Sequence, residues 1–491
     1  MGSRPFPAAS VRLLAACVGV AALSLLAPSA PTTDPWGWIV WGREVLHLQL
    51  STVVPGAPSW KPLPVLVTTP LALAGSSAPT LWLLFARAGA LASLVAAARL
   101  SKRLAGPWAA AFAVAGLILS THWLRAFAHG YTEPLAIGLL VLAVDQHLSG
   151  RPRRALLLGT LVALSRPEAL ALVAAYGLLE WRRRELHLAW AVAASVTGAA
   201  LWIVPDWIGS GDPFHASHVA AEVVPTGGVA TMRALSEAIV IVPLPLSLMA
   251  VAGTVVAIRR RDSRVLCLAA VVGAWAGLLT LLMALGYPAL ARFFVLPAGL
   301  WCIVGAVGAA WGLEAARSRP SRLAAAGAVA IAAVAFVSVR ADRLVGEMGD
   351  AVERAELESQ LVTVVDRTPP AERSCDRLLL PANLGWLKGE IAWRLDLPLR
   401  DVRAVRTSAP AYVKLLADPD GEPRSQPSHL VAVRVRSRPN ASILYSPFGD
   451  AHVRVSRGTR QQLATVATAG PWRALALGGR CGEAREAVAR L

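Results

Sequence analysis

Clusters of arginine alternate with apolar stretches along this chain, and this pattern limits the folds open to it. The clusters lie at 99–103, 151–154, 182–184, 259–264 and 317–322. The alternate connections are nearly free of such clusters and carry acidic residues: Asp34, Glu133, Glu168, Asp212 and Glu222. Because cytoplasmic loops of membrane proteins collect Lys and Arg, the alternation predicts a polytopic membrane protein. It also places the acidic residues together on the extracytoplasmic side.

The composition agrees with this prediction. The chain has 491 residues, of which 55% are hydrophobic, and its mean hydropathy of +0.52 is well above that of soluble domains. The net charge of +17 is spread over the ends of the apolar stretches and forms no continuous face. No nucleic-acid recognition motif accompanies it, so we expect contact with the anionic lipid bilayer and no nucleic-acid partner.

A membrane-spanning helix needs about 20 apolar residues. Candidate spans lie at 11–28, 80–98, 108–127, 133–148, 188–205, 238–258, 265–285, 293–313 and 323–339. The stretch 155–180 lies between two arginine clusters, which a single crossing would place on opposite sides. Pro167 offers a break, because proline removes a backbone donor. We therefore predict a hairpin of two short helices, with Arg166 and Glu168 at its outer tip. This gives about eleven spans and a cytoplasmic N-terminus.

The first apolar run resembles a signal peptide as well as a first span, because Arg4 and Arg12 precede it and small residues follow. We expect an uncleaved helix. The outer loop 29–79 follows it. There Trp36, Trp38 and Trp41 lie among polar residues, which predicts a helix at 36–50 on the outer membrane surface. The apolar segment 62–74 is too short to cross and is expected to be a second interfacial or re-entrant element.

The composition changes to that of a soluble protein near residue 340. We therefore divide the chain into a transmembrane domain, 1–340, and an extracytoplasmic α/β domain, 341–491. Strands are expected at 378–380, 431–433, 442–445 and 453–455, and helices at 350–365 and 383–395. Cys375 and Cys481 are the only cysteines in this polar region. Outside the cytoplasm they are a natural disulfide pair, and the alternative is two unrelated free thiols.

Polar motifs recur at the predicted outer ends of the spans. They are Thr32-Thr33-Asp34-Pro35-Trp36, Ser59-Trp60-Lys61-Pro62, Gly130-Tyr131-Thr132-Glu133-Pro134, Ser165-Arg166-Pro167-Glu168, Gly286-Tyr287 and Arg292-Phe293-Phe294. In this order, with the soluble tail, they resemble the GT-C-type glycosyltransferases over roughly residues 1–340. The resemblance implies a membrane enzyme of mannosyl- or arabinosyltransferase type. Such an enzyme takes a sugar from a polyprenyl-phosphate donor and passes it to a glycan, lipid or protein acceptor.

That chemistry requires a base for the acceptor hydroxyl and fixed positive charge where the lipid phosphate leaves. Asp34 is the candidate base, and its alternative role is to cap the helix that follows. Lys61, Arg166 and Arg292 are candidate phosphate contacts, since the charge rule does not explain cations at outer span ends. Their alternatives are snorkelling or pairing with a nearby carboxylate. Arg87, inside a span, is expected to face the protein interior, either in an ion pair or on the phosphate.

The remaining candidates are assigned to acceptor binding or to support of the site: Glu133, Glu168, Tyr131 and Asp212. Either glutamate could instead be a metal ligand. Asp212, His215 and His218 superficially suggest a metal site, but a flexible acceptor-binding loop is the favoured interpretation. We expect no cofactor, with a divalent metal left open. Two other functions compete. One is a transporter or flippase of a lipid-linked substrate, for which the sequence offers one broken helix, at Arg166-Pro167, but no repeat symmetry between halves. The other is a non-catalytic assembly factor.

Overall fold

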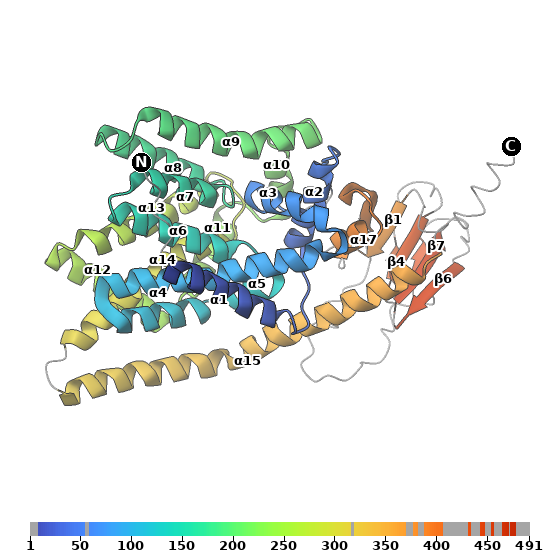
Figure 1. Ribbon diagram of the computed structural model, residues 1–491. Helices are drawn as coiled ribbons and strands as arrows, with labels where there is room; N and C mark the ends of the chain where they lie inside the picture. Colours follow the sequence, from blue (N-terminus) through green and yellow to red (C-terminus); the bar gives the residue numbers. More distant parts are fainter. Residues whose placement is uncertain are drawn as a thin grey trace, which may run out of the picture.

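The computed structural model describes residues 8–54, 58–315, 319–369, 377–381, 387–405, 431–433, 442–446, 453–455, 464–470 and 472–477. Its N-terminal part is helical (Figure 1): α1 (Ala8–Ser24), α2 (Thr33–Leu46), α3 (Pro62–Leu71), α4 (Ala78–Ile118), α5 (Trp123–His129), α6 (Glu133–Leu148), α7 (Pro152–Ala163), α8 (Ala169–Arg182), α9 (Leu188–Ser210), α10 (His215–Val223), α11 (Gly228–Ile239), α12 (Leu244–Arg260), α13 (Ser263–Ala284) and α14 (Val295–Ala315). The last helices are α15 (Arg319–Arg367) and α17 (Lys388–Arg394).

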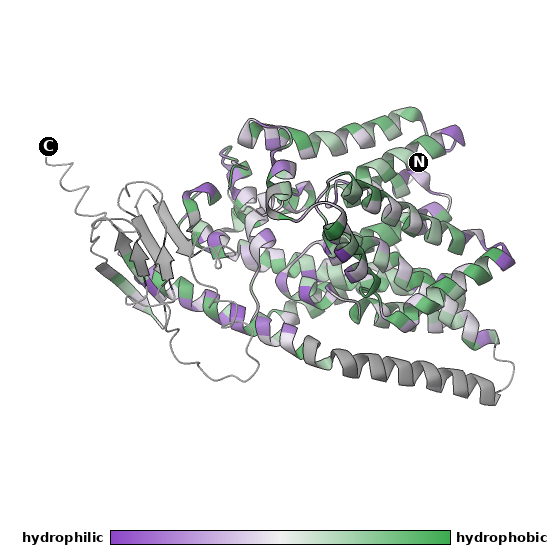
Figure 2. Cartoon of the chain, turned by 180° about the vertical axis from the view of Figure 1, so that it is seen from behind, coloured by the Kyte–Doolittle hydropathy of each residue, from purple (hydrophilic) through white to green (hydrophobic). Residues whose placement is uncertain are grey.

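The apolar helices pack around a core in which α14 is central, since 89% of its most apolar segment is buried. Hydrophilic residues gather at the ends of these helices, and apolar residues lie between them (Figure 2). Within the described residues, four helical segments are long and apolar enough to cross a membrane, or six if each sharply bent pair is one span. The predicted number of about eleven spans is therefore not confirmed, because several helices of the bundle are shorter than a full crossing requires.

The predicted hairpin is present. Helix α7 ends at Ala163 and α8 begins at Ala169, so both Arg166 and Glu168 lie in the turn between them. Pro167 sits at the centre of this turn, where its missing N–H breaks no helical hydrogen bond. The turn brings Arg166 to the same end of the bundle as the loop 29–79 that contains α2.

The tryptophan rings of the predicted surface helix face protein in the structure and not lipid. Trp36, Trp38 and Trp41 lie on α2, and each is almost fully buried in protein. The indole N–H of Trp38 donates to Ser59 O at 2.9 Å, and that of Trp41 donates to Ser51 O at 3.1 Å. The packing is close because Gly42 faces Thr68 of α3, which a Cβ would overlap. The rings that suggested a lipid interface instead fill a second core, formed with α15, α17 and the sheet.

Helix α15 extends unbroken for 49 residues and joins the bundle to the C-terminal strands (Figure 1). It includes both the predicted last span and the predicted helix at 350–365. The proposed domain boundary near residue 340 therefore falls inside a continuous helix. The expected helix at 383–395 is present as α17, although residues 382–386 lie outside the described residues.

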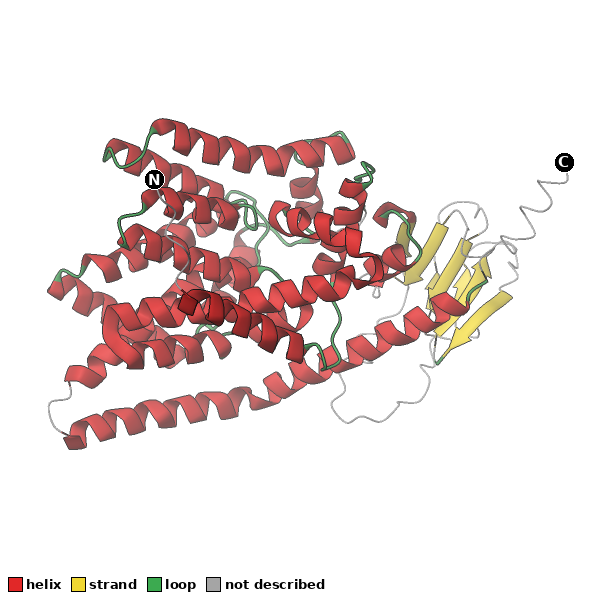
Figure 3. Ribbon diagram, viewed as in Figure 1, coloured by secondary structure: helices red, strands yellow, loops and turns green. Residues whose placement is uncertain are grey.

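All described strands lie at one end of the molecule (Figure 3): β1 (Arg377–Pro381), β2 (Val402–Val405), β3 (Val431–Val433), β4 (Ser442–Ser446), β5 (Val453–Val455), β6 (Ala464–Ala469) and β7 (Trp472–Leu477). Five form a sheet in the order β2-β1-β4-β7-β6, with β1 parallel to both neighbours and β7 antiparallel to both of its own. Strands β3 and β5 pair separately and in parallel. The four strands predicted from the sequence are thus present. Cys375 and Cys481 lie outside the described residues.

Candidate active site

Asp34 lies in the first turn of α2, and its side chain connects distant segments. The carboxylate accepts a hydrogen bond from Ser59 N at 3.1 Å through Oδ1. Its Oδ2 lies 3.3 Å from Nη2 of Arg292, which follows α13 in the chain. The helix-cap position is held by Thr32, so the alternative role of Asp34 as the cap of α2 is not seen. Its two carboxylate oxygens instead join Ser59, in the loop after α2, to Arg292, in the segment before α14.

Glu133 is the centre of a buried ion-pair network. It is the first residue of α6, and its Oε1 lies 3.0 Å from Arg166 Nη2 and 3.4 Å from Lys61 Nζ. The three side chains are at most 7% exposed. Removing charges from water is expensive, and this network offsets that cost by pairing. Its other oxygen, Oε2, has no hydrogen-bond partner among the described residues.

The Glu133 network and the Asp34–Arg292 pair are linked through the backbone carbonyl of Arg292. Nη2 of Arg166 also donates to Arg292 O at 3.2 Å, and the Arg166 guanidinium lies 5.0 Å from the ring centre of Phe293. Lys61 Nζ lies 4.9 Å from the Trp38 ring in a similar cation–π contact. The hairpin turn, the outer loop and the segment before α14 are therefore held in one arrangement.

The charge of this cluster is positive. Lys61, Arg166 and Arg292 contribute three cations, whereas Asp34 and Glu133 contribute two carboxylates. Burial lowers the pKa of Lys61 to about 8, against the opposing effect of Glu133, so the ammonium is still mostly protonated at neutral pH. Glu168 is buried beside the network, and both of its oxygens are without a hydrogen-bond partner among the described residues. Its burial raises the pKa of Glu168, which favours a neutral acid there.

A cavity of about 460 Å³ opens on this cluster. Asp34, Lys61, Arg166 and Arg292 all line it, together with Ser59 from the outer loop. The Arg292 side chain is 33% exposed and its Nε is without a hydrogen-bond partner within the described part of the chain. It is therefore the most accessible cation of the cluster for an anionic group entering the cavity. The convergence predicted from the sequence is present for the base candidate and three of the four cation candidates.

The other predicted residues lie elsewhere. Arg87 donates to the carbonyl oxygens of Ser24, Phe127 and Ala128 at 2.8–3.3 Å, so it holds α1, α4 and α5 together. These contacts favour a structural role for Arg87, with carbonyl oxygens as its partners in place of the carboxylate of the predicted ion pair. Tyr131 packs edge-on against Trp38, with ring centres 6.5 Å apart, next to the cluster but not on the cavity wall.

Asp212 lies on a partly exposed loop, 2.7 Å from His218 Nδ1. It lies next to the cavity-lining residues Pro213 and Phe214 but does not line the cavity itself. In the part of the chain that the structure describes, no three His, Cys, Asp or Glu side chains gather as metal ligands.

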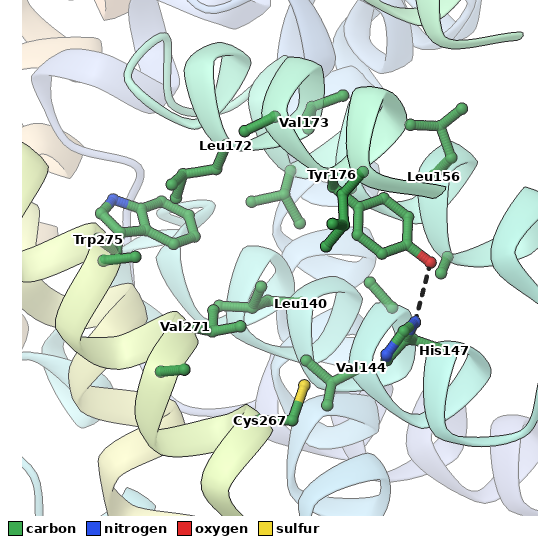
Figure 4. A pocket seen from close by; sticks show the side chains of 18 of the residues that line it. Leu140, Val144, His147, Leu156, Leu172, Val173, Tyr176, Cys267, Val271 and Trp275 are labelled. Atoms are coloured by element: carbon green, nitrogen blue, oxygen red, sulfur yellow. Dashed lines mark hydrogen bonds between the residues drawn. The ribbon is translucent and has the colours of Figure 1, made fainter. Parts of the chain in front are cut away.

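A second, larger cavity of about 640 Å³ lies between α6, α7, α8 and α13. Its wall is mainly apolar, with Leu140, Val271 and Trp275 facing inward and a 3.1 Å hydrogen bond between His147 Nδ1 and Tyr176 Oη at one end (Figure 4). It has none of the carboxylates of the first cavity among its lining residues. The smaller cavity is therefore the candidate active site.

Two solved structures of ArnT from Cupriavidus metallidurans match this chain over nearly its whole length. The structure bound to undecaprenyl phosphate has a TM-score of 0.53 and covers 96% of this chain and 98% of its own, at 15% sequence identity. The apo structure has a TM-score of 0.54, with 95% and 98% covered, also at 15% identity. The chain has a GT-C fold. No protein-family model matches the sequence, and a search of curated proteins finds no match.

The GT-C fold confirms at the level of architecture the resemblance drawn from the motifs, and it agrees with an integral membrane protein. Sequence reasoning missed part of the cavity wall. Asp206, on α9, is 2% exposed and faces the cavity, with Trp202 one turn before it. The predicted span ended at residue 205, one position short of this acid. An acidic residue near the end of an otherwise apolar helix was the available signal.

Proposed function

We propose that this protein transfers a sugar from a polyprenyl-phosphate donor to a glycan, lipid or protein acceptor outside the cytoplasm, with inversion at the anomeric carbon. The observation that carries the proposal is the meeting of Asp34 with Lys61, Arg166 and Arg292 on one cavity wall. The GT-C fold supports it, since one ArnT structure with this fold is bound to undecaprenyl phosphate.

The cations would stabilise the leaving phosphate. Negative charge grows on the phosphate oxygen as its bond to the sugar breaks, and fixed positive groups in a water-poor site stabilise that charge. Arg292 is the first contact in this proposal, because its side chain is the accessible one. Lys61 and Arg166 are buried and pair with Glu133, so their positive charges are fixed in position before the substrate binds.

Asp34 would act as the base. Its Oδ2 pairs with Arg292, and a phosphate that binds Arg292 would compete for that guanidinium. The freed carboxylate then accepts the proton of an acceptor hydroxyl, whose oxygen attacks the anomeric carbon. The bond from that carbon to the phosphate oxygen breaks, and its electron pair leaves with the polyprenyl phosphate. One displacement of this kind inverts the anomeric centre.

The test compares wild-type protein with Asp34→Asn in cells that lack the gene. Glycolipids and envelope glycans are measured by mass spectrometry, together with the amount of protein in the membrane. We expect wild-type protein to restore a missing glycan and Asp34→Asn to leave it missing while the lipid-linked donor accumulates. If Asp34→Asn restores the missing glycan, Asp34 is not the base. If deletion changes no glycan or glycolipid, the enzymatic function itself is wrong.

A further inference from the structure

The wall of the 460 Å³ cavity formed by α9 and α10 carries polar atoms that the protein leaves unsatisfied. Asp206 Oδ2 accepts a hydrogen bond from Ala216 N at 2.8 Å, in the first turn of α10. Its Oδ1 is buried and has no partner among the described residues. A buried carboxylate oxygen without a donor is costly, so this position favours a ligand that brings one.

A histidine lies on the same wall. His215 precedes Ala216 in the chain and lines the cavity, and its Nε2 is buried with no partner in the described part of the chain. A neutral imidazole nitrogen either donates or accepts, depending on the tautomer. Asp206 and His215 together therefore match hydroxyl groups, which can both donate and accept.

Aromatic residues line the same cavity as these atoms. Trp41, Trp60 and Trp202 line the cavity, and the rings of Trp41 and Trp60 meet edge-on with centres 5.5 Å apart. The indole N–H of Trp202 donates to Ala163 O at 2.9 Å, which fixes the ring. Rigid aromatic walls with a few polar atoms are typical of sites for ligands that have both apolar faces and hydroxyl edges.

The charge of this wall differs from that of the catalytic cluster. The lining residues that the structure describes between Ala199 and Val224 include no Lys or Arg, whereas Lys61, Arg166 and Arg292 line the remainder. A phosphate-bearing group on the α9–α10 wall would face the Asp206 carboxylate without a cation. The cavity thus separates a side suited to phosphate from a side suited to uncharged hydroxyls.

We infer that Asp206 and His215 form the acceptor subsite, and that the acceptor presents the uncharged hydroxyl groups of a sugar there, not a phosphate. This inference rests on the proposed function and names its acceptor class. Asp206 Oδ1 accepts a hydrogen bond from one acceptor hydroxyl, and His215 Nε2 bonds a second. The half-buried Trp202 ring packs against the sugar face, with Trp41 and Trp60 supporting the wall behind, which orients a further hydroxyl toward Asp34.

The test uses the full-length protein in lipid nanodiscs and two kinds of probe. Methyl glycosides of mannose, glucose, galactose and arabinose probe the acceptor subsite, and undecaprenyl phosphate probes the donor side. Binding is followed by saturation-transfer NMR for the glycosides and by equilibrium titration for the lipid. We expect Asp206→Asn to weaken glycoside binding by at least about tenfold, the loss typical of a hydrogen bond to a charged group, and to leave lipid binding unchanged.

Two further variants make the result decisive. Asparagine can still accept from Ala216 N, so Asp206→Asn preserves the anchoring of α10, and unchanged thermal stability checks this. Arg292→Gln should give the opposite pattern, with weak lipid binding and normal glycoside binding. Glu237→Gln, an exposed acid outside the cavity, serves as control.

The inference is overturned if Asp206→Asn binds glycosides as wild type does, or if wild-type protein binds mannose 6-phosphate but no neutral glycoside. Loss of undecaprenyl phosphate binding together with glycoside binding in Asp206→Asn would also overturn it. Wild-type protein that binds glycosides through Asp206 but binds no polyprenyl phosphate would instead contradict the proposed donor. The two failures are thereby distinguishable.

Discussion

Arg292 Nη2 lies 3.3 Å from Asp34 Oδ2, although 258 residues separate the two in the chain. This contact joins the first turn of α2 to the segment before α14, and it places the candidate base beside the most accessible cation of the cavity. In the proposed function, a substrate phosphate opens this ion pair, which couples donor binding to the availability of the base.

The first prediction concerns Asp34. Removal of a general base typically lowers a rate by a factor of about 10²–10⁴. We expect Asp34→Asn to lower sugar transfer by at least about 100-fold, measured with membranes and radiolabelled lipid-linked donor. The amide oxygen can still accept from Ser59 N, and Arg292, which loses its carboxylate partner, is partly exposed, so the melting temperature should fall less than in a variant of the buried Glu133. Asp145→Asn removes an ion pair with Arg103 at a distant, partly exposed site and should retain full transfer.

The second prediction concerns the centre of the buried network. Glu133→Gln leaves Lys61 and Arg166 buried without their carboxylate, a change that typically costs about 3–5 kcal/mol. We expect a marked fall in melting temperature and in the yield of folded protein. The double variant Glu133→Gln, Lys61→Met should recover part of the stability, because one uncompensated cation is removed. Equal stability of wild type and Glu133→Gln would show that the network carries little energy.

The third prediction is a pH dependence of stability outside the bundle. Glu358 on α15 and Glu390 on α17 are buried against each other, near Trp36, with Arg394 and Asp366 also acting on Glu390. Burial raises the pKa of both carboxyl groups, that of Glu390 from 4.5 to about 7. The folded state therefore keeps protons that the unfolded chain has released. Stability should be full below pH 4.5 and fall as the pH rises through 7.

Thermal unfolding between pH 4.5 and 8 checks this. The melting temperature should fall by a few degrees across the range in wild type, and Glu390→Gln should flatten the curve. Glu356→Gln removes a neighbouring but more exposed acid on the same helix and should leave the wild-type dependence intact. A curve that is equally steep in Glu390→Gln would assign the titration to other groups.

The fourth prediction concerns the contact between α2 and the C-terminal region. Glu44 accepts hydrogen bonds from Ser51 N at 3.0 Å and from Leu399 N at 2.8 Å, and both bonds are buried. Glu44→Ala leaves both donors without a partner, at a cost of about 1–3 kcal/mol each. We expect hydrogen exchange of the Leu399 amide to accelerate at least about tenfold. Asp401→Asn, whose side chain is half-exposed, should leave that rate unchanged, and no acceleration in Glu44→Ala would exclude this anchoring role.

Arg43 adds to the same contact. Its guanidinium donates to the carbonyl oxygens of Ala392, Trp393 and Leu397 at 2.6–3.1 Å, at the end of α17. Gly389, at the start of α17, packs so closely on Trp36 that a Cβ would overlap it. Asp34 near the start of α2 thus contacts Arg292, whereas Arg43 and Glu44 near its end contact the chain at and after the end of α17.

Features that depend on residues close together in the chain could be predicted from the sequence. The hairpin at Arg166 was predictable, because Pro167 and the flanking arginines constrain the same few residues. The convergence of Asp34, Lys61 and Arg166 followed from placing each at the same predicted membrane face. The pairing of Glu133 with both cations did not follow, since charge patterns give a membrane side but no distances.

Other features depend on partners remote in sequence. The tryptophans of α2 were expected at a lipid surface, because nothing near them in the chain indicates α17, which is some 350 residues away and covers them. Asp212, which two histidines follow in the chain, was predicted to take part in acceptor binding, whereas the acid that lines the cavity is Asp206. The proposed disulfide between Cys375 and Cys481, the domain boundary and the orientation of the termini stay predictions.

Helix α15 has a mechanical consequence. At 1.5 Å per residue its 49 residues form a rod about 74 Å long, with one end beside the bundle and the other beside β6 and β7. A stiff rod transmits torque, so a displacement of the sheet would turn the last hydrophobic segment with it. Replacing two residues in the middle of this helix by glycine would weaken the helix there, by about 1 kcal/mol per glycine, and so loosen the link between its two ends without changing a residue of the cavity.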